Sequence, residues 1–92
     1  MKIYTVCGNG IGSSLLLKMK VEAIAMENGI DVDVESIDSN AAVGKDADLF
    51  ITVKEFENIF KEHQKVAIIR SYTNKKKIEE DILPILKEMN NK

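Results

Sequence analysis

The chain has 92 residues, the size of one small domain, and its 45% hydrophobic and 30% charged residues are typical of a water-soluble globular protein. The formal net charge of −2 argues against a protein that binds nucleic acid by neutralising phosphates. No apolar run approaches the roughly 20 residues that cross a bilayer, and the N-terminal run is too short for a signal peptide, so we expect one cytoplasmic domain over residues 1–92.

A strand, a glycine-rich loop and a helix are predicted at the start of the chain. Residues 2–6 are β-branched and aromatic, which favours a strand. Residues 7–14 contain three glycines and are predicted to form a loop. Ser13 or Ser14 is the expected N-cap of a helix that ends near Asn28. Spacings of three and four predict a buried stripe on this helix, formed by Leu16, Met19, Ala23 and Met26 and continued by Ile30 beyond the turn.

The rest of the chain alternates strands with helices. Polar and apolar residues alternate over 31–37, which is typical of an edge strand. Gly29 lies where a helix C′ glycine is expected, and Pro84 should kink or split the last helix. The further elements predicted are a loop with a short helical turn (38–47), a strand (48–53), a helix (54–63), a strand (65–69) and a helix (75–90).

This order predicts an α/β fold. A four-stranded parallel sheet should be covered by helices on both faces, as a three-layer, Rossmann-like α/β/α sandwich. Ligands of such sheets bind at the carboxyl ends of the strands. The first strand ends at Cys7, the only cysteine of the chain, and at the glycine-rich loop. The only thiol therefore coincides with the expected ligand site.

The loop after the first strand has the features of a phosphate-binding loop. Gly8, Gly10 and Gly12 would let backbone N–H groups converge on one point, and the following helix N-terminus adds partial positive charge. The alternative is a tight turn that binds nothing. Gly12 comes one residue too early for a Gly-x-Gly-x-x-Gly dinucleotide motif, and no Gly-Lys-Ser/Thr follows.

Cys7 is expected to be a nucleophile. A free thiol has a pKa of about 8.5, and converging amides with a helix N-terminus would favour the thiolate. The alternative is a small, buried, unreactive side chain. A low-molecular-weight cysteine phosphatase is a further alternative, but such enzymes clamp phosphate with an arginine six residues after the cysteine. Ser13 occupies that position here, which indicates a site that passes phosphate on.

Two runs resemble a known family. Residues 6–14 read Val-Cys-Gly-Asn-Gly-Ile-Gly-Ser-Ser, and residues 18–21 read Lys-Met-Lys-Val. These runs resemble the IIB component of the bacterial phosphoenolpyruvate-dependent sugar phosphotransferase system (PTS). The ascorbate-type IIB proteins are most similar, and the galactitol-type are related. The likeness is strong over residues 2–24, whereas residues 70–73, where a second loop should face Cys7, match no pattern of the family.

The resemblance implies a phosphotransferase of the EIIB type. In that family the loop cysteine takes a phosphoryl group from a phosphohistidine on a IIA protein and gives it to a sugar held by the membrane-embedded IIC transporter. The nucleophile carried over is Cys7, and neither transfer needs a metal or a bound cofactor. The remaining alternative is a regulatory phosphate- or nucleotide-binding module with an inert Cys7. The residues carried over as phosphate-binding are Gly8, Asn9, Gly10, Ile11, Gly12, Ser13 and Ser14.

Overall fold

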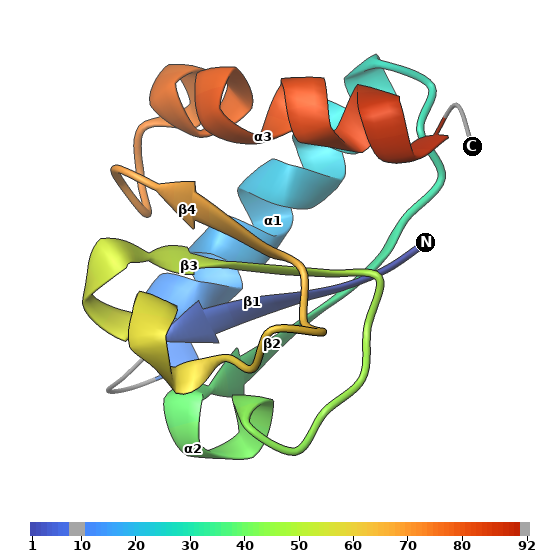
Figure 1. Ribbon diagram of the computed structural model, residues 1–92. Coiled ribbons are helices and arrows are strands. Elements are labelled where there is room, and N and C mark those ends of the chain that lie inside the picture. The colour runs from blue at the N-terminus through green and yellow to red at the C-terminus, as the bar shows by residue number, and fades with distance from the viewer. Residues whose placement is uncertain (8–10, 91–92) are drawn as a thin grey trace.

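The computed structural model describes the backbone of residues 1–7 and 11–90 and the side chains of residues 1–6 and 15–90. Strands and helices alternate along the chain in the predicted order (Figure 1). The elements are β1 (Lys2–Cys7), α1 (Ile11–Glu27), β2 (Asp33–Asp38), α2 (Ser39–Ala42), β3 (Leu49–Val53), the 3-10 helix η1 (Lys54–Ile59), β4 (Val66–Ile69) and α3 (Lys75–Asn90).

The four strands form one parallel sheet in the order β2-β1-β3-β4, with β2 at an edge as predicted. β1 pairs with β2 up to Cys7, which lies opposite Asp38. It pairs with β3 only up to Thr5, which lies opposite Ile51. The chain leaves β1 toward β2 and leaves β3 toward β4, so the two connections diverge between β1 and β3. Open parallel sheets bind ligands at such a switch point.

Helices lie on both faces of the sheet, which confirms the α/β sandwich (Figure 1). Alternate residues of a strand face opposite layers. Ile3 and Ile51 pack in the larger core with α1 and α3. Tyr4 and Phe50 belong to a smaller core on the other face, and their rings stack 5.8 Å apart. The second layer is thin because α2 and η1 are only four and six residues long.

The buried face of α1 is not the predicted one. Leu16, Met19 and Met26 are exposed by 47%, 59% and 78%, and Ala23 is only half-buried. Apolar residues occur on most sides of this helix. Spacings of three and four therefore fit two different rows of apolar side chains, the predicted row and the row that is buried. Packing against the sheet and α3 decides between them. Among the side chains that the structure describes in this helix, from residue 15 on, the buried ones are Leu17, Val21, Ile24 and Ala25.

The prediction for α1 was wrong at its amino end and correct at its carboxyl end. The helix begins at Ile11, so Ser13 and Ser14 lie within it and neither is the N-cap. A glycine inside a helix costs only about 1 kcal/mol relative to alanine, so Gly12 does not delay the start. The other end is as predicted: Gly29 has a φ of +69°, and the amide of Ile30 donates to the carbonyl of Ala25 at 2.9 Å.

Two later elements also depart from prediction. The helix expected over 54–63 is a shorter 3-10 helix, and Phe60 beyond it packs on Phe50 with ring centroids 5.1 Å apart. Pro84 does not split α3, which continues through it. The helix is held on both sides of this proline because Ile82 and Leu86 are fully buried.

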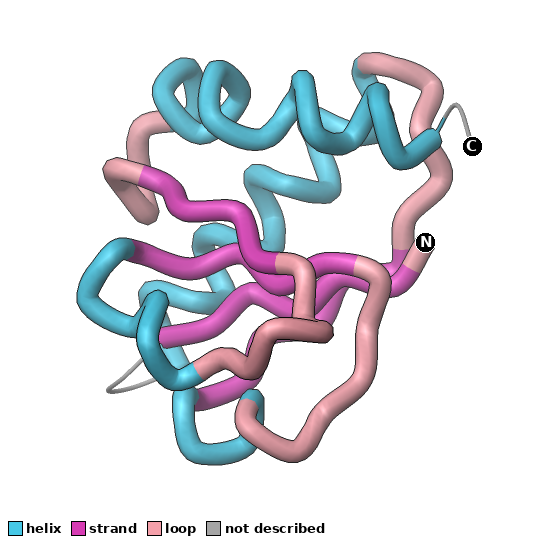
Figure 2. Tube along the Cα trace, in the orientation of Figure 1, coloured by secondary structure: helices cyan, strands magenta, loops and turns pink. Residues whose placement is uncertain are grey.

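Gln64 joins two loops at the amino end of the sheet. Figure 2 shows the segments before β3 and before β4 as loops. The buried Gln64 side chain donates to the carbonyl of Ala42 at 3.3 Å and to that of Lys45 at 3.1 Å. Its own oxygen accepts from the amide of Lys61 at 2.8 Å. These bonds fix the segments that lead into β3 and β4.

Candidate functional site

Cys7 is the last residue of β1 and lies at the carboxyl edge of the sheet, beside the switch point. The backbone of Ile11, Gly12, Ser13 and Ser14 forms the start of α1, directly after the segment that follows Cys7. The expected phosphate-binding residues Gly8, Asn9 and Gly10 lie outside the described residues, as do the side chains of Cys7 and 11–14. The fold thus brings the start of α1 and the end of β1 to the expected edge.

Two hydroxyl groups converge on the carbonyl oxygen that precedes Cys7. Thr52 donates from its Oγ1 to the oxygen of Val6 at 3.2 Å, and it is fully buried. Tyr72 donates from its hydroxyl to the same oxygen at 3.2 Å. Neither residue was assigned a role from the sequence, although residues 70–73, which include Tyr72, were expected to form a loop facing Cys7. The only signal for Thr52 was a hydroxyl residue in an otherwise apolar strand.

The segment from Arg70 to Asn74 is held firmly in the loop between β4 and α3. The hydroxyl oxygen of Ser71 accepts from the amides of Thr73 at 3.2 Å and Asn74 at 3.1 Å. The side-chain oxygen of Asn74 accepts from the amide of Lys77 at 3.1 Å and so caps α3. The loop predicted to face Cys7 therefore reaches at least the peptide next to it, through Tyr72.

Comparison with known proteins decides the family. The model of the PTS system, Lactose/Cellobiose specific IIB subunit, matches residues 2–84. The chain belongs to this family. An ascorbate-specific PTS system EIIB component of Mycoplasma pneumoniae is 34% identical over 71 residues, which are 75% of each chain. One of the same name from Shigella flexneri is 47% identical over 36 residues, 39% of this chain and 36% of that protein.

Membership makes the chain a IIB phosphocarrier of a sugar PTS, a phosphotransferase component that works with IIA and IIC components. Within the described part of this IIB chain, no three His, Cys, Asp or Glu side chains gather as metal ligands. Across the same residues, no helix combines the length and apolar character needed to cross a membrane.

The only arginine of this IIB chain, Arg70, is bound to α3. Its Nε donates to Asp81 at 3.1 Å, and its terminal nitrogen lies 3.0 Å from Glu80. Its backbone amide also donates to Asp81 at 3.0 Å. The hydrogen bonds to Asp81 and then Glu80 raise the pKa of the guanidinium. Arg70 is thus paired with two carboxylates of α3.

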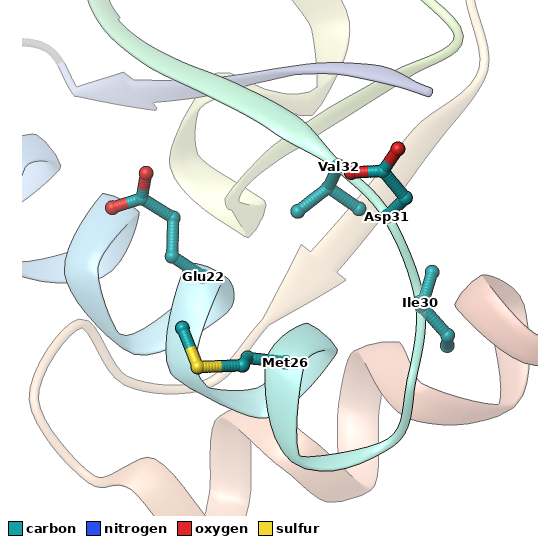
Figure 3. Close-up of a pocket in the computed structure, with 5 residues that line it drawn as sticks. All are labelled: Glu22, Met26, Ile30, Asp31 and Val32. Carbon is teal, nitrogen blue, oxygen red and sulfur yellow. The ribbon is translucent and has the colours of Figure 1, made fainter.

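A cavity of about 240 Å³ lies elsewhere on the IIB chain (Figure 3). It is lined by Glu22 and Met26 of α1 and by Ile30, Asp31 and Val32 of the connection to β2. This connection precedes the start of β2, so the cavity lies at the amino edge of the sheet, away from Cys7. It is not part of the candidate site.

Proposed function

We propose that Cys7 is the phosphoryl acceptor of this IIB chain. The observation that carries the proposal is the position of Cys7 at the end of β1, beside the switch point and just ahead of α1. The family match includes this region. The helix N-terminus favours an anion there, both as thiolate and as phosphoryl group. The residues proposed to hold the phosphoryl oxygens are Gly8, Asn9, Gly10, Ile11, Gly12, Ser13 and Ser14.

The proposed reaction consists of two transfers. First, the Cys7 thiolate attacks the phosphorus of a phosphohistidine on IIA, so an S–P bond forms while the N–P bond breaks and the imidazole takes up a proton. Second, a sugar hydroxyl attacks the same phosphorus, so an O–P bond forms, the S–P bond breaks and the hydroxyl proton passes to solvent. The covalent intermediate divides one transfer into two steps. The protein mainly positions the groups and stabilises oxygen charge.

The partners proposed are the phosphorylated IIA protein and the membrane-embedded IIC transporter. Both must reach the same sulfur at one edge of the sheet, so they compete for this face. The chain acts in the cytoplasm as one IIB domain and touches the membrane complex only through IIC. The sugar is proposed to be ascorbate or a related compound because the relatives from Mycoplasma pneumoniae and Shigella flexneri are named ascorbate-specific.

The test is sugar phosphorylation in a reconstituted system. Membranes that hold IIC are mixed with phosphoenolpyruvate, the general phosphotransfer proteins, IIA and this chain, and ascorbate, lactose and cellobiose are each supplied. Ascorbate phosphate should form with the wild type and not with Cys7→Ser, whose thermal unfolding serves as the control for folding. Equal product with Cys7→Ser would contradict the role of Cys7. A phosphorylated product from lactose or cellobiose, and none from ascorbate, would contradict the proposal that the sugar is ascorbate.

A further inference from the structure

Val6 is the first residue of β1 beyond the part of this strand that is paired with β3. The register between β1 and β3 runs from Ile3 to Thr5 of β1 and stops there. Val6 is fully buried, and a buried carbonyl without a donor is costly. Two side-chain hydroxyls donate to this oxygen, one from Thr52 on β3 and one from Tyr72 in the loop after β4, each at 3.2 Å.

This oxygen belongs to the same planar peptide as the amide nitrogen of Cys7. Two donors from different elements therefore fix the orientation of the peptide at which β1 ends. They also offset the partial negative charge of the carbonyl, which would otherwise disfavour a nearby thiolate or phosphoryl group. Both effects act on the residue proposed as the nucleophile.

The position of the Tyr72 hydroxyl depends on the loop before α3, which is far from Val6 in the sequence. Its loop is fixed by the Ser71 turn, by the cap at Asn74 and by the bonds between Arg70 and Asp81 of α3. Thr52, by contrast, lies within the sheet itself. The tyrosine hydroxyl thus connects the loop before α3 with the end of β1, although Val6 and Tyr72 are 66 positions apart in the chain.

We propose that Tyr72 is a positioning residue for Cys7 and acts together with Thr52 through the carbonyl of Val6. The inference rests on the proposed function, in which Cys7 is the nucleophile. Loss of the Tyr72 hydroxyl raises the pKa of the Cys7 thiol and slows its reaction. Because Thr52 still donates, the effect of this one loss is graded rather than complete.

The test measures the alkylation rate of Cys7 by iodoacetamide from pH 5 to pH 10, by mass spectrometry, in the wild type, Tyr72→Phe and Tyr4→Phe. One hydrogen bond is worth on the order of 1 kcal/mol, so Tyr72→Phe should react about fivefold more slowly at pH 7 and its profile should move to higher pH. Tyr4→Phe removes the same group from a ring that stacks on Phe50, and its profile should match the wild type.

The variant Thr52→Val keeps the side-chain shape and removes the other donor. It should shift the profile in the same direction, and the double variant with Tyr72→Phe should shift it by more than the sum of the two, because the carbonyl then keeps neither hydroxyl. A Tyr72→Phe profile identical to that of the wild type would overturn the inference. So would an equal shift in Tyr4→Phe, which would indicate a general loss of stability.

This experiment fails separately from the test of the proposed function. Alkylation reports on the thiol without any partner protein, whereas sugar phosphorylation requires IIA and IIC. A shifted Tyr72→Phe profile in a chain that phosphorylates no sugar would support the positioning role and overturn the function. An unshifted Tyr72→Phe profile in a chain that phosphorylates ascorbate would overturn the positioning role and support the proposed function.

Discussion

Gly29 and Gly44 both follow a helix, yet the backbone needs a glycine only at the first. Gly29 ends α1 with a φ of +69°, whereas Gly44 has no such angle. A Cβ at either position would meet no atom within 4 Å, so crowding does not distinguish them. The difference lies in the left-handed backbone, which disfavours every residue with a Cβ.

Gly29→Ala should therefore lower the free energy of unfolding by about 1 kcal/mol, while Gly44→Ala should leave it unchanged or slightly higher. Urea titrations of the two variants, followed by circular dichroism, measure the difference. An equal decrease in the free energy of unfolding for both variants would contradict the explanation by the positive φ of Gly29.

At the scale of the element, α1 shows what periodicity can and cannot predict. The carboxyl end of this helix was predicted because Gly29 marks it, whereas its start lies at Ile11, before the expected N-cap Ser13 or Ser14. Its inner face was predicted wrongly, because apolar side chains surround the helix and two stripes fit the same spacing. In α3 charged residues separate the faces, and the side chains of Ile78, Ile82 and Leu86 are fully buried.

Two adjacent leucines of α1 test its orientation. Leu17 is fully buried and Leu16 is 47% exposed. Leu17→Ala should cost about 2–5 kcal/mol, because it leaves a cavity between the sheet and the helices. Leu16→Ala should cost about 0.5 kcal/mol or less. Denaturant unfolding of both variants measures this contrast, and a larger loss for Leu16→Ala would mean that α1 is rotated by one residue.

At the scale of the whole molecule, the strand order explains why Cys7 lies where it does. The alternation of strands and helices predicted a parallel sheet, and with it a ligand site at the carboxyl ends of the strands. The order β2-β1-β3-β4 was not predictable, because the sequence pattern does not state which strands are neighbours. Residues 70–73 were expected to form a loop facing Cys7, but the hydrogen bond from Tyr72 to the carbonyl of Val6 could not be predicted from the sequence.

The sheet and the start of α1 also predict a reactive thiol. If the helix N-terminus and the loop amides stabilise the thiolate, the pKa of Cys7 is lowered, and the wild type should be alkylated rapidly down to about pH 6–7. Glutathione, a thiol without such surroundings, is the control measured in the same buffers. A rate for Cys7 that rises only above pH 8 would mean that the site does not activate the thiol.

The central claim is that Cys7 carries a phosphoryl group, and the intact mass of the protein tests it most directly. The chain is incubated with phosphoenolpyruvate, the general phosphotransfer proteins and IIA, and parallel samples omit IIA or contain Cys7→Ser. We predict a gain of one phosphoryl group in the wild type, and no gain in either parallel sample. A gain of the same size in Cys7→Ser, or none in the wild type with any IIA supplied, would contradict the account.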